Sequence, residues 1–185
     1  MPAVKLSQTG HKFQEWIFTH PWIKNLVKLP TEEISLMRPV RQIIPKLTTN
    51  DLKNPTRSKR VLKNKTHFAK VMKFYSVHNY KVFACIRDSE CQLLVEFHPE
   101  CVSYFERFHH CRITSGTVNC LFVIGNCDLE YRSVARVNDE FRINILPRKQ
   151  KLMDQIPVLV INQATVADWG QMEAQTTFPF VHQEV

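Results

Sequence analysis

The chain has 185 residues, of which 44% are hydrophobic and 23% are charged, and these proportions are ordinary for one globular domain with extensions. Its four glycines form no glycine-rich loop that could hold a phosphate, and no apolar run reaches the roughly 18–20 residues needed to cross a bilayer. The net charge of +8 is local: residues 53–87 contain ten lysines and arginines and no acidic residue, which leaves 15 basic and 17 acidic residues elsewhere.

The first 13 residues mix lysine, glutamine and histidine with small residues. They lack the continuous apolar region of a secretory signal, so the sequence predicts a soluble, intracellular protein.

The six cysteines stand at positions 85, 91, 101, 111, 120 and 127, mostly beside large apolar residues. In a reducing compartment such cysteines behave as small buried hydrophobic residues, so we expect free thiols. No two of them have the spacing of a zinc knuckle, and His109 and His110 are adjacent. The sequence therefore predicts no metal site and no cofactor.

An N-terminal arm is predicted from residues 11–28, where a short helix begins at Pro21 and places its apolar side chains on one face. Residues 29–65 contain four prolines and look irregular, although a few apolar side chains there are expected to dock on the domain. The basic part of this stretch, residues 53–65, is predicted to be an exposed loop.

Three strands are predicted next, at 67–77, 80–88 and 91–97, because apolar-rich runs alternate with two-residue breaks suited to hairpins. A helix of about ten residues is expected after Pro99, capped by His98. Strand patterns return at 119–124, 129–137, 141–146 and 156–161, and residues 164–174 resemble a short helix.

Three strands, a helix and at least two further strands are the order of an OB-fold, a small five-stranded Greek-key barrel with its helix between strands 3 and 4. We therefore expect a mainly β protein with a single OB-fold, an N-terminal extension and a short C-terminal helix. Residues 1–64 would form the arm and basic loop, packed in part on the barrel, and residues 65–185 the OB-fold with its C-terminal helix and tail.

No nucleophile, base or carboxylate pair has the arrangement of a catalytic site, so we do not expect an enzyme. An autonomous module for single-stranded nucleic acid is the alternative. Aromatic residues at 74, 75, 80 and 83 alternate with Lys70, Lys73 and Lys81, the composition of a stacking platform in a basic groove. The same pattern equally describes a strand whose rings fill the barrel and whose lysines face water.

A family resemblance extends over nearly the whole chain. The run THFAKVMKFYSVHNYKVFACIRDSECQLLVEFHPECVSYFERFHHCRIT at 66–114, with HPWIKNL upstream and VLVINQAT and TFPFV downstream, closely resembles the third Ever-Shorter-Telomeres family, the small regulatory subunits of budding-yeast telomerase. That family is similar to the OB-fold domain of the shelterin component that recruits telomerase, and the residues Pro21, Trp22 and Ile23 look like a shared N-terminal element.

The resemblance implies a non-catalytic subunit of the telomerase holoenzyme, located in the nucleus at telomeric chromosome regions. Its implied partners are the telomerase reverse transcriptase subunit and other holoenzyme subunits. Contact with telomerase RNA or telomeric single-stranded DNA would be indirect or weak, and no membrane is involved. The implied docking surface differs from the face that OB-folds use for nucleic acid.

The resemblance also implies which residues take part in protein binding, each through its local motif. They are Trp22, Lys70, Lys73, Asp88, Glu106, Arg112, Thr117, Asn119 and Asp168, with Phe105 beside them as a structural residue. A tryptophan among charges of both signs is typical of protein recognition.

Several of these residues have a structural interpretation as well. Trp22 would anchor the arm, Asp88 would stabilise the turn before Ser89, and Arg112 would pair with Asp88 or Glu106. Glu106, Thr117 and Asn119 are the stronger surface candidates, because Glu106 lies opposite the apolar face of its helix and the other two precede a strand.

Overall fold

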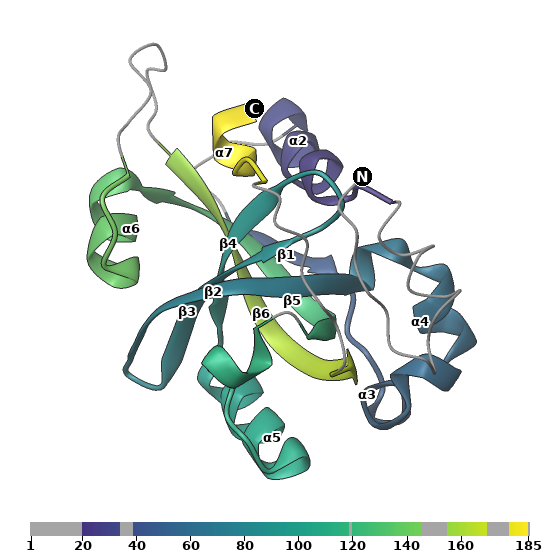
Figure 1. The fold of residues 1–185 in the computed structure, drawn as a ribbon. Helices are drawn as coiled ribbons and strands as arrows, with labels where there is room; N and C mark the ends of the chain where they lie inside the picture. Colours follow the sequence, from purple (N-terminus) through teal and green to yellow (C-terminus); the bar gives the residue numbers. More distant parts are fainter. Residues whose placement is uncertain (1–19, 34–38, 119, 146–154, 170–177, 185) are drawn as a thin grey trace.

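The computed structural model describes residues 20–33, 39–118, 120–145, 155–169 and 178–184. Within them, a barrel built mainly from long, curved strands carries short helices on its outside (Figure 1). The strands are β1 (Val40–Ile44), β2 (Phe68–His78), β3 (Lys81–Arg87), β4 (Gln92–Phe97), β5 (Leu121–Ser133) and β6 (Gln155–Asp168).

The strand order is β1-β5-β2-β3-β4-β6, and a further pairing of β5 with β6 closes the sheet. β4 and β6 run parallel, whereas the other pairs are antiparallel. Five strands thus form a closed Greek-key barrel, and the helix α5 (Pro99–His109) lies between its third and fourth strands. This is the predicted OB-fold.

The meander and its helix match the sequence pattern closely. The tight β2–β3 turn places Asn79 and Tyr80 at φ values of 51° and 60°, the left-handed region that such two-residue hairpins require. α5 begins where expected, because the His98 Nδ1 accepts the backbone N–H of Glu100 at 3.2 Å and Pro99 occupies the first turn. It ends at His109, and the C-cap residue His110 has φ 57°.

The predicted irregular arm contains regular structure. α2 (Ile23–Glu33) continues past residue 28, β1 pairs with the second half of β5, and the predicted start of the arm at residues 11–19 lies outside the described residues. The sequence predicts a loop at residues 53–65, and this is wrong because the segment is largely helical. It contains the end of α3 (Thr49–Lys53), the 3₁₀ turn η1 (Pro55–Arg57), the helix α4 (Lys59–Lys63) and the start of the 3₁₀ turn η2 (Lys65–His67).

Three predictions for the C-terminal half are wrong. The strand predicted at 129–137 ends at Ser133 and gives way to α6 (Val134–Phe141), and residues 142–145 of the predicted strand 141–146 form no strand. Residues 164–168 of the predicted helix 164–174 belong to β6, and residues 170–174 lie outside the described chain. A short C-terminal helix is present instead as α7 (Val181–Glu184).

Apolar side chains pack in three groups. The barrel interior is closed at its ends by α5 and by α2 together with α7. A second group packs α3 and α4 against Phe68, Leu121 and Val123 on the outside of the barrel. In a third group, α6 covers the outer face of β3, β4 and β6. All six cysteines are free thiols, as predicted, and five of them are buried.

Candidate protein-docking surface

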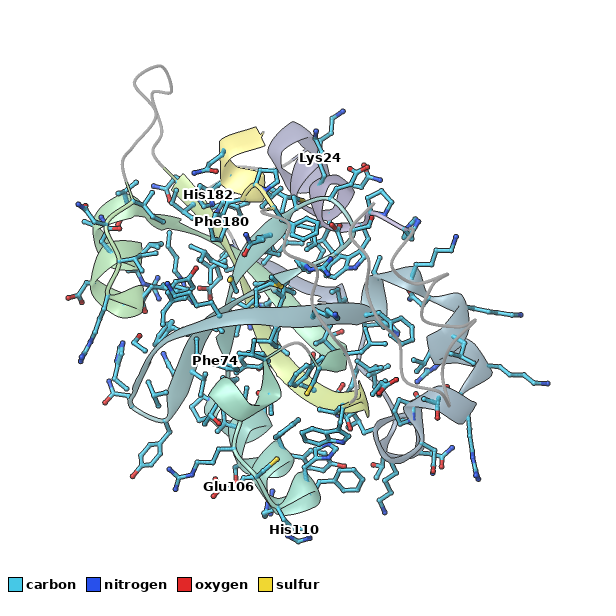
Figure 2. All side chains as sticks on the ribbon, in the orientation of Figure 1. Lys24, Phe74, Glu106, His110, Phe180 and His182 are labelled. Carbon is cyan, nitrogen blue, oxygen red and sulfur yellow. The ribbon has the colours of Figure 1, made fainter. Side chains whose placement is uncertain are left out.

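Two exposed charges of the predicted site lie on and just after α5. Phe105 is fully buried in the core, as expected of a structural residue, so the next residue, Glu106, is turned outward. The Glu106 Oε1 lies 3.4 Å from the Arg112 Nε, and the two side chains retain 48% and 75% exposure. A pair this exposed adds little stability, so both charges remain available to a partner. Figure 2 shows Glu106 and His110 at the outer end of α5.

Lys73 is the third exposed charged residue of the set. It lies on β2, and its Nζ is 5.4 Å from the centre of the Tyr75 ring. The short turn η3 (Ser115–Thr117), which follows Arg112, contacts β2. The segment after α5 is therefore held against the strand that carries Lys73.

Four other predicted site residues are buried. Lys70 is fully buried on β2 opposite Arg87. Thr117, predicted as a surface residue, is only 1% exposed, and its hydroxyl donates to the Thr114 carbonyl at 2.8 Å. Trp22 and Asp88 are each 3% exposed. Side chains this deeply buried offer almost no surface for direct contact with another protein.

Trp22 and Asp88 together fix the start of α2. The Asp88 Oδ2 accepts the backbone N–H groups of Trp22 and Ile23, each at 2.8 Å, and the Trp22 Nε1 donates to the Phe68 carbonyl at 2.8 Å. The predicted anchoring role of Trp22 is therefore confirmed. The Asp88 Oδ1 also accepts from Glu90 N at 2.8 Å, which confirms its role in the β3–β4 turn.

Two predicted residues remain. Asp168 is half-buried at the end of β6, opposite Leu121 on β5. Asn119 lies outside the described residues. The structure thus brings Glu106 and Arg112 together and pairs Trp22 with Asp88.

The face that OB-folds commonly use for nucleic acid, over their second and third strands, is covered by α6. Phe83, predicted as a stacking ring, is fully buried, and it meets Phe141 of α6 edge-on at 5.0 Å and stacks on His78 at 4.8 Å. Tyr75 contacts the same Phe141 ring at 5.9 Å. Phe83 and Tyr75 therefore pack against α6, whereas Tyr80, in the β2–β3 turn, is 84% exposed.

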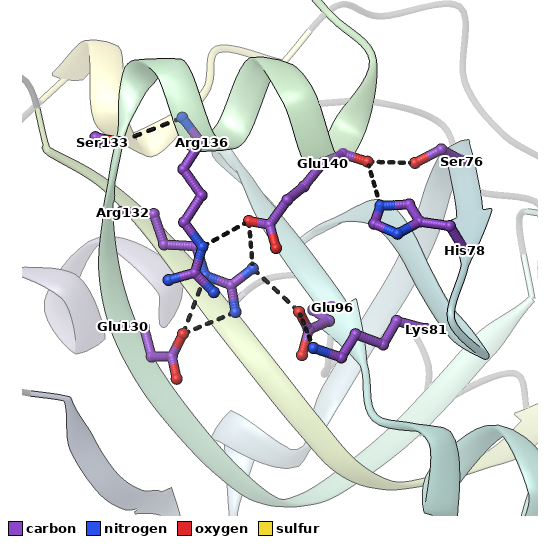
Figure 3. Close-up of polar contacts among 9 residues, drawn as sticks. All are labelled: Ser76, His78, Lys81, Glu96, Glu130, Arg132, Ser133, Arg136 and Glu140. Carbon is purple, nitrogen blue, oxygen red and sulfur yellow. Dashed lines mark hydrogen bonds and ion pairs between the residues drawn. The ribbon is translucent and has the colours of Figure 1, made fainter.

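A buried arginine holds α6 in place (Figure 3). Arg132 is 2% exposed, and its guanidinium lies 3.1 Å from Glu96, 2.7 Å from Glu130 and 3.2 Å from Glu140 of α6. Burial acts to lower the pKa of Arg132, but the three carboxylates raise it overall, so the guanidinium stays charged. Lys81 lies 3.9 Å from Glu96 in the same network.

This network and the scaffold of α3 and α4 are not among the features predicted from the sequence. A recognisable signal existed for α3: Thr48 and Asp51 have the spacing of a capping box, and both of its hydrogen bonds are present. Arg132 had no comparable signal, because its three partners come from β4, β5 and α6 and meet only in the closed barrel.

Among the described residues, no three histidine, cysteine, aspartate or glutamate side chains are arranged to hold a metal ion. In the same part of the chain, every helix is too short or too polar to span a bilayer.

Comparison with known proteins gives a consistent picture. A family model for the shelterin complex subunit TPP1/ACD matches residues 19–183. The telomere replication protein EST3 of Candida glabrata is 37% identical over 172 residues, 92% of this chain and 93% of the relative. That of Eremothecium gossypii is 35% identical over 189 residues, 99% of this chain and 90% of the relative.

A solved structure of the Est3 telomerase subunit from the yeast Hansenula polymorpha superposes with a TM-score of 0.54 at 21% identity, covering 62% of this chain and 67% of that chain. At this identity the likeness shows the fold alone, and the fold it shows agrees with the barrel described above.

Proposed function

We propose that this chain, which belongs to the TPP1/ACD family and is related to the telomere replication protein EST3, is a non-catalytic regulatory subunit of telomerase. It acts in telomere maintenance by docking on the reverse transcriptase subunit of the holoenzyme. Its place of action is the nucleus, at telomeric chromosome regions.

The exposed pair of Glu106 and Arg112 carries the proposal. Charges of opposite sign on a rigid helix end give a partner both an attractive and a repulsive element to recognise. Phe105 and the His98 cap fix α5, so the backbone that carries Glu106 is held in place. We assign the exposed Lys73, which lies on the strand contacted by η3, to the same mixed-charge surface.

The buried members of the predicted set support the surface from within. Asp88 and Trp22 join the arm to the barrel, Lys70 lies within β2, and Thr117 shapes the turn after Arg112. Asn119 and Asp168 stay assigned to the docking surface as part of the proposal, and so does the division into an arm (1–64) and an OB-fold (65–185).

Autonomous nucleic-acid binding through β2 and β3 has less support. It requires Lys70 and Phe83 at the surface, and both are fully buried. Protein docking requires neither residue to move.

A charge-swap experiment tests the docking role. Glu106→Arg and Arg112→Glu are made singly and together, and each variant is tested for co-purification with the reverse transcriptase. We expect each reversal to reduce co-purification at least tenfold, the size of a lost hot-spot contact, with an unchanged unfolding midpoint because the pair is exposed.

The double variant separates two explanations. It restores the internal ion pair but presents both charges in reversed positions, so a partner that recognises the charges will still fail to bind. Recovery of full co-purification in the double variant would limit the pair to a structural role and contradict the proposal. Asp139→Arg, an exposed reversal on α6, is the matched control and should leave co-purification unchanged.

A further inference from the structure

Most of the excess positive charge lies on the short helices beside the barrel. Residues 46–65 contain seven lysines and arginines and one acidic residue, a net of +6 in a chain of +8. Six of these seven basic side chains are exposed, namely Lys46, Lys53, Arg57, Lys59, Arg60 and Lys63. We name residues 46–65 the basic platform.

The basic platform is a folded scaffold. Leu52 and Val61 are buried against the outer face of β5, and Asp51 accepts hydrogen bonds from Thr48 N at 3.0 Å and the Ser58 hydroxyl at 2.8 Å, besides its contact with Arg60. Burial alone would raise the pKa of Asp51, but these bonds lower it to about 2. The one carboxylate of the platform is therefore used internally, and the cations face outward.

A groove of about 690 Å³ separates the basic platform from α5. Lys46 of the platform and Arg107 of α5 both line it, and in the described part of the chain neither has an ion-pair partner. The lining also includes the amide side chains of Asn126 and Asn162, the ring of Tyr104, and one carboxylate, Glu100. Cations on both walls and amides in the lining suit an anionic strand with hydrogen-bonding groups.

Aromatic rings continue from the groove to the surface. Tyr104 stacks on Phe108 at 5.9 Å, Phe108 meets His109 at 4.8 Å, and His109 meets Trp169 at 5.6 Å. Phe108 and Trp169 are 36% and 49% exposed. The His109 ring is fixed by a 2.9 Å hydrogen bond between its Nε2 and the Thr165 hydroxyl. We name these four rings the aromatic ladder.

We propose that the basic platform, the groove and the aromatic ladder form a binding site for single-stranded nucleic acid. Lysines and arginines would hold phosphates, and exposed rings would stack on bases, the combination found in single-strand binding proteins. An acidic protein segment would use the cations but would leave Phe108 and Trp169 without a role. This site goes beyond the proposed docking surface, and its helices α3, α4 and α5 lie away from α6 (Figure 1).

The test uses the full-length protein and labelled RNA and DNA strands of the same sequence, each about 12 nucleotides long, a length within the range of one OB-fold. Affinity should fall with rising salt, with a slope of about 0.7 in log units for each phosphate contacted. Because Lys53 and Lys63 are exposed on α3 and α4, Lys53→Gln/Lys63→Gln should preserve the fold and reduce this slope by about 1.4.

The matched control is Lys24→Gln/Arg142→Gln, which removes two exposed charges from α2 and from the end of α6. It should leave the salt slope unchanged. Trp169→Ala should weaken binding about tenfold at every salt concentration, because it removes stacking without removing charge.

Three outcomes would overturn the proposal. The first is no binding of the labelled strands by the wild-type protein at low salt, and the second is an equal loss of salt slope in the two double variants. The third is that poly-glutamate binds as tightly as the nucleic acid and that Trp169→Ala has no effect. The last would identify an acidic protein surface as the ligand. A preference between the RNA and DNA strands would identify the source of the ligand.

Failure here is distinguishable from failure of the docking proposal. Lys53→Gln/Lys63→Gln should still co-purify with the reverse transcriptase after nuclease treatment, and Glu106→Arg should still bind the labelled strands.

Discussion

The carboxylate of Asp88 accepts the backbone N–H of Trp22 at 2.8 Å, across 66 residues of sequence. The same carboxylate accepts from Ile23 at 2.8 Å, and from Glu90 and Cys91 at 2.8 and 3.0 Å. One side chain thus caps the first turn of α2 and orders the β3–β4 turn.

Replacing Asp88 by alanine should destabilise the protein by about 2–4 kcal/mol, because it leaves buried N–H groups without acceptors. Urea unfolding measures the loss, and hydrogen exchange should increase first at the start of α2. Glu90→Ala, an exposed substitution in the same turn, is the control and should cost less than about 0.5 kcal/mol. Equal stability of the two variants would show that the cap contributes nothing.

Thr117 should affect telomerase association only through folding. Thr117→Val removes the hydroxyl that donates to Thr114 and should cost about 1–2 kcal/mol, whereas Thr117→Ser keeps the donor and should cost less. Thermal unfolding and co-purification are measured on the same samples. Loss of association in Thr117→Val without loss of stability would mean that this buried residue contacts the partner.

Arg132 should be the most costly substitution in the polar network. Arg132→Met leaves Glu96 and Glu140 without their buried cation, and breaking one side of a buried ion pair costs about 3–5 kcal/mol. Arg136→Gln removes an outer partner of Glu140 that is 52% exposed, and it should cost less than about 1 kcal/mol. Urea unfolding at neutral pH compares them, and similar values would contradict the central role of Arg132.

Stability should decline in mild acid because of His67. Burial and the charge of Arg60 lower the pKa of this ring to about 4, against an opposing effect of Asp51, and within the described residues neither ring nitrogen has a hydrogen-bond partner. The neutral ring is the folded form. The neutral His67 ring therefore makes its full contribution to the free energy of unfolding above about pH 6.5, the pKa of histidine in the unfolded chain. This contribution is lost as the pH falls toward 4.

His67→Leu should remove most of this decline between pH 6.5 and 4. Unfolding free energies of both proteins, measured across that range, provide the check. A decline of the same size in the variant would assign it to other groups, such as His109, whose pKa is also lowered by burial.

The sequence predicts the fold best where neighbouring residues decide the structure. In β4 the core residues Leu93, Val95 and Phe97 stand at alternate positions, and α5 has its cap and its proline at adjacent positions. β1 carries no such signal, because its partner on β5 lies more than 80 residues away. The valines of α6 favour a strand, but the Ser133 hydroxyl accepts from Arg136 N at 3.2 Å and starts a helix.

The candidate surface is predictable for similar reasons. Glu106 follows from helix periodicity, since its neighbour Phe105 belongs to the apolar face. The burial of Lys70 and Thr117 does not follow from any local pattern, because lysine and threonine at strand and turn positions are usually exposed. Only the closed barrel, with η3 against β2, covers them.

The contact between α2 and α7 has a consequence for biosynthesis. Val181 packs in the same core as Ile23 and Val27, and the Phe178 carbonyl accepts from the Gln92 amide at 2.7 Å. A nascent chain can form the β2–β4 meander early, since those contacts are local. It cannot complete the surroundings of α2 until residues near 181 have left the ribosome, so the packing around α2 forms only after α7 has been synthesised.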